Sequence, residues 1–201
     1  MGPLGVLGRR VMHRSEKRSL LALFQSAGGA GWTDAWGTAE DVAKPSSDPC
    51  AEWSGVYCDE DGYLLNLDLR GRDLLGSLPS AMGDLQRVQR IDMSGNPRLF
   101  GEIPTRMQRL TTLVHLDLSN CALTGTLPTE LSGMSNLRTL NVLNNPNLQG
   151  TELPEGHGLR QQETIIAQSG VSQELKSLHE RHGHHTMDRG PTTNRENSMA
   201  A

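Results

Sequence analysis

Aromatic residues are scarce in this chain: seven of 201, namely three Trp, two Tyr and two Phe. A core rich in aromatic side chains is therefore not expected. No apolar run approaches the roughly 18 residues that a membrane-spanning helix needs. The formal net charge is only -4, which gives no indication of a nucleic-acid partner. The sequence contains no Asn-x-Ser/Thr sequon, which argues against a heavily glycosylated surface protein.

The charge is distributed unevenly along the chain. Residues 1–18 have a net charge of +4, whereas residues 31–61 have a net charge of -7. We expect residues 1–14 to be a basic, disordered leader. They would make a poor secretory signal peptide, because the apolar part is short, interrupted by Gly and followed by the basic cluster. An organelle presequence and a misassigned start are alternatives.

One phrase occurs four times, in residues 64–79, 88–104, 113–128 and 137–154. The anchors of the four copies, Leu67, Ile91, Leu116 and Leu140, are 24, 25 and 24 residues apart. A fixed period in this range predicts a solenoid, in which each unit buries its apolar face only against its neighbours. The LxL core of each phrase is typical of a short strand with alternate side chains pointing inward. We therefore expect an α/β solenoid of four repeats over residues 63–154, with a short parallel sheet.

The segment 15–62 precedes the repeats. Residues 15–29 predict a short helix with Leu20, Leu23 and Phe24 on one face. The sequences GGAGW at 28–32 and DPCAEWSGVYC at 48–58 lead directly into the first repeat. Together with the repeat consensus LxxLxLSxNxLxGxIP, they resemble plant-type leucine-rich repeat proteins with an N-terminal cap. Such proteins include receptor-like kinase ectodomains and algal and protist proteins, and the resemblance covers residues 15–154.

The resemblance implies structural roles for several residues. Cys50 and Cys58 occupy cap positions that are disulfide-bonded in the family; the alternative is a pair of reduced thiols in a reducing compartment. Family members place an inward-turned Asn after each strand, where it bonds loop backbone groups that would otherwise be buried unpaired. Asn96 and Asn145 fit this ladder, and Cys121 is an accepted substitute. Arg72 departs from it, so we expect the ladder to be incomplete beside the cap.

Residues between the inward leucines are expected to face solvent on the concave side, where solenoids usually bind. Three columns of such residues form the candidate partner-binding face. They are Asn66, Arg90, His115 and Thr139; Asp68, Asp92, Asp117 and Asn141; and Arg70, Ser94, Ser119 and Leu143.

The three stacked carboxylates of the second column are the sharpest chemical feature. They are suited to a basic ligand or a cation. However, Asp before the second Leu is a routine residue of the repeat phrase, and Arg70 and Arg90 flank the column. We favour this routine explanation, and we assign neither a cofactor nor a metal site. Ser94, His115 and Asp117 lie on one strand face without an oxyanion hole or a nucleophile turn, so we expect no catalysis.

The C-terminal part matches no motif. A helix pair is predicted between about residues 161 and 179, and residues 155–180 are a candidate C-terminal cap for the solenoid. Residues 181–201 are polar and expected to be disordered. The tail histidines could bind zinc adventitiously, but no Cys or carboxylate cluster completes a site there. They are His179, His182, His184 and His185.

Three functions are compatible with this sequence. The first is a non-enzymatic module that binds a peptide or protein on the concave face. The family context then implies a secretory or extracellular location. The second is an accessory subunit docked in a larger assembly, in an organelle if the basic leader is a presequence. The third is a secreted enzyme inhibitor of the polygalacturonase-inhibitor type, although such inhibitors carry longer arrays.

Overall fold

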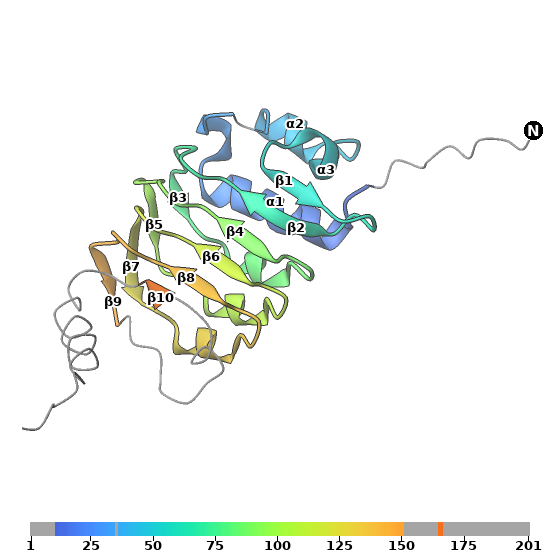
Figure 1. Ribbon diagram of the computed structural model, residues 1–201. Helices are drawn as coiled ribbons and strands as arrows, with labels where there is room; N and C mark the ends of the chain where they lie inside the picture. Colours follow the sequence, from blue (N-terminus) through green and yellow to red (C-terminus); the bar gives the residue numbers. More distant parts are fainter. Residues whose placement is uncertain (1–10, 35, 151–164, 167–201) are drawn as a thin grey trace, which may run out of the picture. The chain divides into compact units, whose positions relative to one another are not determined.

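The computed structural model describes residues 11–34, 36–150 and 165–166. Two sheets run along the repeats (Figure 1). The larger has the strand order β1-β2-β4-β6-β8-β10, and the smaller has the order β3-β5-β7-β9. The strands of the larger sheet are β1 (Val56–Cys58), β2 (Leu64–Asp68), β4 (Arg90–Asp92), β6 (His115–Asp117), β8 (Thr139–Asn141) and β10 (Ile165–Ile166). Those of the smaller are β3 (Gly76–Ser77), β5 (Leu99–Gly101), β7 (Ala122–Thr126) and β9 (Asn147–Gln149).

Each of the four repeats contributes one strand to each sheet, and in the first three a short 3-10 helix follows. These helices are η2 (Ser80–Asp84), η3 (Thr105–Arg109) and η4 (Thr129–Gly133). Strands β2, β4, β6 and β8 pair in parallel, with the four anchor residues directly opposite one another. All four anchors are at most 1% exposed. The prediction of an α/β solenoid with inward-pointing leucines and a parallel sheet is confirmed.

The asparagine after a strand bonds the backbone of two repeats. Asn96 is fully buried; its Nδ2 donates to the carbonyl oxygens of Met93 (2.7 Å) and Leu69 (2.9 Å), and its Oδ1 accepts the N–H of Leu74 (3.1 Å). Asn145 makes the equivalent three bonds, to Val142, Leu118 and Leu123. Each asparagine thereby satisfies buried polar groups that would otherwise lack a partner.

In the third repeat, Cys121 occupies the ladder position of Asn96 and Asn145. No side-chain acceptor is needed there. The second repeat has one extra residue after Asn96, and this places the N–H of Leu99 2.9 Å from the carbonyl oxygen of Asn96. The backbone thus accepts the N–H that a side chain would otherwise have to accept. The thiol of Cys121 donates weakly to the carbonyl oxygens of Met93 (3.4 Å) and Ser119 (3.5 Å). The inserted residue and the Asn-to-Cys exchange in the next repeat are therefore physically linked.

The cap is built from α1 (Arg14–Ser26), η1 (Gly29–Gly31), α2 (Ala39–Ala43) and α3 (Pro49–Glu52). The predicted helix is confirmed, with Leu20, Leu23 and Phe24 buried. All three tryptophans are also buried. Trp32 and Trp36 contact Phe24, and Trp53 stacks on Trp36 with ring centroids 4.5 Å apart. Four of the seven aromatic residues are therefore concentrated in one cluster within the cap.

The Cys50–Cys58 disulfide ties α3 to β1 within the cap. Two side chains are prominent in joining the cap to the array. Arg72 leaves the ladder and instead donates to the carbonyl oxygen of Asp34 (3.1 Å) and the hydroxyl of Ser54 (2.8 Å). The buried carboxylate of Glu16 in α1 accepts the backbone N–H groups of Leu64 (2.5 Å) and Gln86 (2.8 Å).

Two sequence expectations need correction at the ends of the chain. Residues 11–13 are ordered rather than part of a leader: Met12 is 3% exposed, and the N–H of His13 donates to the carbonyl oxygen of Gly62. Ile165–Ile166 forms strand β10, which pairs in parallel with β8, where a helix was expected. β-branched residues favour such an extended edge pairing.

The remaining end segments lie outside the described residues. These are residues 1–10 of the expected leader, the rest of the candidate C-terminal cap at 155–180, and the tail at 181–201. Within the described part of the chain, no helix has both the length and the apolar character to cross a bilayer.

Candidate ligand-binding surface

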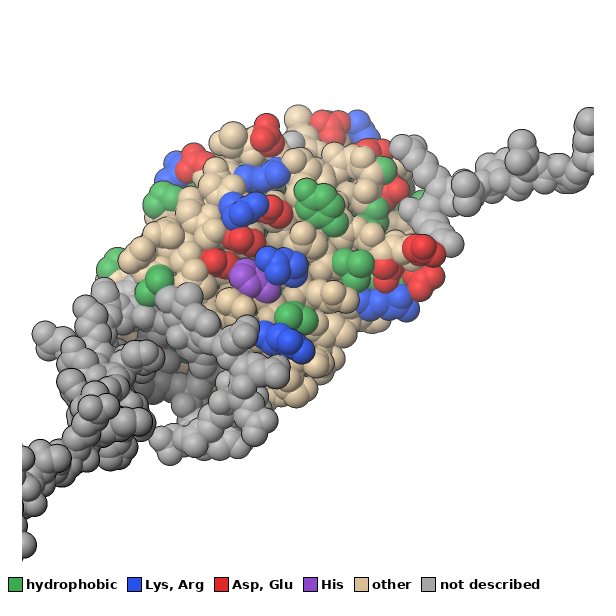
Figure 2. All heavy atoms as spheres, in the orientation of Figure 1, with side chains coloured by type: hydrophobic (Ala, Val, Ile, Leu, Met, Phe, Trp, Pro, Cys, Tyr) green, Lys and Arg blue, Asp and Glu red, His purple; other side chains and the backbone are tan. Residues whose placement is uncertain are grey.

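The exposed face of the larger sheet carries the predicted columns, and we call it the strand face. The pairing places Asn66 opposite Arg90, Arg90 opposite His115, and His115 opposite Thr139. Residues directly opposite on neighbouring strands point to the same side and lie about 5 Å apart. Figure 2 shows charged side chains of both signs and a histidine gathered over these strands.

The acidic column lies beside this first column. Asp68, Asp92 and Asp117 are in register on β2, β4 and β6, and Asn141 continues the line on β8. All four side chains are partly exposed. The sequence therefore predicted which residues are brought together on this face, although their role in binding stays a prediction.

The third column lies just beyond the strand ends, and its serines form hydrogen bonds to the aspartates of the acidic column. The hydroxyls of Ser94 and Ser119 donate to Oδ1 of Asp92 (2.7 Å) and Asp117 (2.6 Å). The backbone N–H groups of the same serines donate to the same oxygens. Ser119 is only 5% exposed, which corrects the expectation that its side chain faces solvent and is accessible to a partner. Leu143, the last of the column, is half-buried.

The arginines neutralise only one end of the acidic column. Arg70 donates from Nε and Nη2 to both carboxylate oxygens of Asp68, at 2.9 Å and 2.7 Å. These hydrogen bonds, opposed by partial burial, lower the pKa of Asp68. Arg70 reaches Asp92 only at 3.6 Å. Arg90 is exposed and forms no ion pair with any residue that the structure describes.

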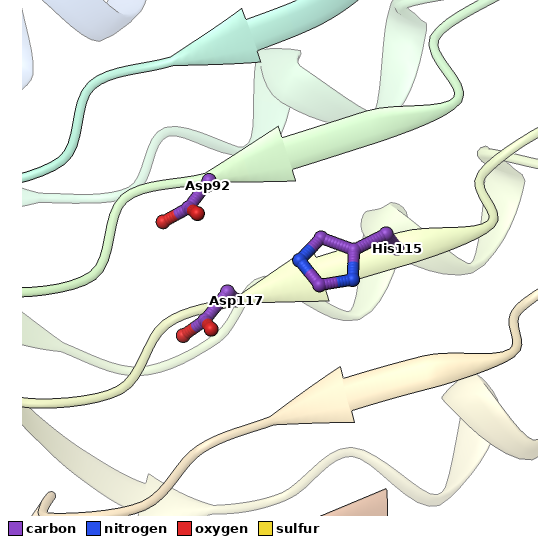
Figure 3. A group of neighbouring side chains, drawn as sticks. All are labelled: Asp92, His115 and Asp117. Carbon is purple, nitrogen blue, oxygen red and sulfur yellow. The ribbon is translucent and has the colours of Figure 1, made fainter. Parts of the chain in front are cut away.

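His115 lies where the two columns meet. Its side chain, Asp92 and Asp117 each place one potential donor atom within 4.8 Å of the others (Figure 3). Partial burial, together with the positive charge of Arg90, lowers the pKa of His115. This downward shift favours the neutral form of the ring.

Tyr57 is a member of this face that the sequence analysis missed. It lies on β1, antiparallel to β2, directly opposite Asn66, and is 56% exposed. Paired residues share a face of the sheet, so its ring extends the surface toward the cap. The alternation of apolar and exposed residues in Val56-Tyr57-Cys58 is typical of a strand and indicates that Tyr57 faces solvent. However, β1 comes before the first repeat and was treated as part of the cap.

Comparison with known proteins agrees with this geometry. Residues 112–134, which include the third copy of the phrase, match the Leucine Rich Repeat family model. This segment therefore matches a leucine-rich repeat, and the chain is similar to leucine-rich repeat proteins. It is 40% identical over 65 residues to a probable leucine-rich repeat receptor-like protein kinase of Arabidopsis thaliana; the alignment covers 32% of this chain and 7% of that protein.

A second curated relative is polygalacturonase inhibitor 1 of Oryza sativa subsp. japonica. It is 32% identical over 100 residues, which cover 49% of this chain and 28% of the inhibitor. The chain thus spans less than a third of the length of either curated relative.

Solved structures of Arabidopsis thaliana proteins share the fold. A chain of the BIR3–SERK2 complex aligns with a TM-score of 0.56 and 25% identity, over 75% of this chain and 80% of that one. The leucine-rich repeat ectodomain of the membrane receptor kinase GASSHO1/SCHENGEN3, crystallised with CASPARIAN STRIP INTEGRITY FACTOR 2, aligns with a TM-score of 0.52 and 26% identity. That alignment covers 66% of this chain and 17% of the receptor. The fold is therefore that of leucine-rich repeat ectodomains, which is a protein-interaction fold.

Proposed function

We propose that this protein is a non-enzymatic binding module that recognises a peptide or protein segment on the strand face. The observation that carries the proposal is the row of exposed, chemically different groups held in register there. Arg90 and Tyr57 are exposed, and the carboxylate of Asp92 is only partly neutralised. Such side chains offer directional contacts on a rigid sheet, whose own conformation costs little to fix on binding.

The size of the face limits the ligand. Strands β2, β4, β6 and β8 give a platform about 15–20 Å across, at about 4.8 Å between strands. This suits a short peptide, a loop or one edge of a partner protein. The two solved relatives support a protein ligand, since one was crystallised as the BIR3–SERK2 complex and the other with CASPARIAN STRIP INTEGRITY FACTOR 2.

We also propose that the protein acts in the secretory pathway or outside the cell. The Cys50–Cys58 disulfide supports this location, because disulfides persist in oxidising compartments. The similarity to a receptor ectodomain supports it as well. Mass analysis of native protein under non-reducing conditions tests the proposal: an intact bridge is expected, and two free thiols would exclude a secreted protein.

The binding proposal is tested by a crosslinking pull-down from the native source. The double variant Asp92→Asn with Asp117→Asn removes two charges from the strand face and keeps the shape of both side chains. The matched control, Asp73→Asn with Asp84→Asn, removes two charges from residues paired to arginines elsewhere. We expect the first variant to lose its partner and the control to keep it. A partner retained undiminished by both variants contradicts binding at this face, and near-stoichiometric recovery of one large assembly indicates a resident subunit instead.

Inhibition of a polygalacturonase is the second candidate function, and the observation that favours it is the 32% identity to the rice inhibitor. It is tested by adding the protein to a panel of polygalacturonases and measuring the release of reducing sugar. Dose-dependent loss of activity, absent with the Asp92→Asn and Asp117→Asn variant, would identify an inhibitor acting through the strand face. Unchanged activity at protein in large excess would exclude that function for the enzymes tested.

A further inference from the structure

Two aspartates and a histidine converge on one point of the strand face. His115 and Asp117 are alternate residues of β6 and so point to the same side, and Asp92 pairs directly with Asp117 from β4. One donor atom from each residue lies within 4.8 Å of the other two (Figure 3). Donor atoms that share one tetrahedral zinc ion lie about 2.0–2.2 Å from it and hence about 3.3–3.6 Å apart. Side-chain rotations that move these atoms by about 1 Å would bring them into that range.

The two carboxylates are oriented before any ion arrives. In each, Oδ1 is held by two donors, the hydroxyl and the backbone N–H of the serine two residues later. The second oxygen of Asp92 has no hydrogen bond from a described residue, and that of Asp117 accepts one, from Asn141 (2.9 Å). Hydrogen bonds of this kind to a ligand carboxylate fix its direction and are a regular part of metal sites.

The histidine is also available as a donor. Within the described part of the chain, its ring nitrogens form no hydrogen bond or ion pair. Two arginines flank the cluster. Arg70 is held by both oxygens of Asp68 and approaches Asp92 at 3.6 Å, and Arg90 pairs with His115 across β4 and β6. Because Asp68 binds the guanidinium of Arg70, this guanidinium lies beside Asp92, His115 and Asp117 and does not cover them.

We propose that Asp92, His115 and Asp117 bind one divalent transition-metal cation, of which Zn²⁺ is the best match. An imidazole nitrogen with two carboxylates suits zinc, whereas calcium takes six to eight oxygen ligands and magnesium is held mainly by oxygens and water. Three protein ligands leave at least one coordination position open to solvent on the strand face. Such a site would place a coordination position that a ligand group could occupy at the centre of the strand face.

Zinc binding by the full-length protein tests the proposal by isothermal titration calorimetry. The tail histidines could bind zinc independently, so the reference protein carries His179, His182, His184 and His185 changed to Ala. We expect one equivalent of Zn²⁺ to bind this protein. Asp92→Asn, His115→Ala and Asp117→Asn are each expected to weaken binding by at least tenfold. Asp73→Asn, which removes the same charge from a residue paired with Arg98, is expected to leave it unchanged.

Each outcome decides the matter. Far-ultraviolet circular dichroism first establishes that every variant keeps the fold, and the conservative Asp92→Asn exchange provides a second variant should His115→Ala unfold. Loss of binding in the three site variants alone supports the proposal. Binding that is absent from the reference protein, or equal in all variants, overturns the proposal. Removing a bracing hydroxyl with Ser119→Ala is expected to weaken binding by about tenfold without abolishing it.

Discussion

The asparagine ladder predicts unequal costs for two neighbouring substitutions. Asn96→Ala leaves the carbonyl oxygen of Leu69 and the N–H of Leu74 without these partners, and removes one of two donors to the carbonyl oxygen of Met93. Each buried group left unpaired costs about 1–1.5 kcal/mol, so the loss is about 3 kcal/mol. Cys121→Ala removes the weak S–H contacts to Met93 and Ser119 and a single buried sulfur, for a loss of about 1 kcal/mol.

The free energy of unfolding of both variants is measured by urea titration with two probes. Far-ultraviolet circular dichroism follows the repeats, and tryptophan fluorescence follows the cap, where all three tryptophans are buried. We expect Asn96→Ala to lose about 2 kcal/mol more than Cys121→Ala by circular dichroism. Equal losses would refute the argument that the N–H of Leu99, already bonded to Asn96, frees position 121 from an accepting role. Non-coincident probe transitions would show that cap and array unfold separately.

Three further predictions concern the cap and the thiol. Glu16→Gln replaces a carboxylate that accepts two backbone N–H groups with an amide, one end of which is a donor. The free energy of unfolding is expected to fall by about 2–3 kcal/mol, measured as a lower urea midpoint of tryptophan fluorescence. An unchanged midpoint would contradict the role of this buried carboxylate. Replacing Cys50 and Cys58 together by Ala removes the covalent loop and is expected to lower the free energy of unfolding by about 2–3 kcal/mol in the same assay. No loss would mean that the bridge does not constrain the unfolded chain. Burial raises the pKa of Cys121 to about 11, so iodoacetamide at pH 8 is expected to label it only after denaturation; rapid labelling of the native protein would show that this residue is accessible.

The regular part of the molecule follows from the sequence because it repeats. Leu67 and Ile91 are buried for the same reason, and a single period fixes the position of both. The columns on the strand face follow from it too, since the alternation of a strand decides which residues share a side. The disulfide, in contrast, was inferred from resemblance to a family, because the spacing of Cys50 and Cys58 alone does not specify a bridge.

Features that depend on contacts between distant segments were not predictable. Glu16 lies in an ordinary amphipathic helix, and nothing in its local sequence indicates that its carboxylate accepts N–H groups 48 and 70 residues away. Arg72 departs from the ladder visibly, but its partners in the cap come from a tertiary contact. The meeting of His115 with Asp92 was also missed, because the columns were considered separately and the diagonal contact between strands was not.

Site-specific photocrosslinking tests the central claim, that a partner occupies the strand face, most directly. A photoreactive amino acid is placed at Asn66 or Thr139, at the two ends of the strand face, and at Glu130, an exposed residue of η4. The protein is then exposed to its native extract, and the adducts are identified by mass spectrometry. We expect the same partner from Asn66 and Thr139 and none from Glu130. Adducts formed only from Glu130 would contradict recognition at the strand face.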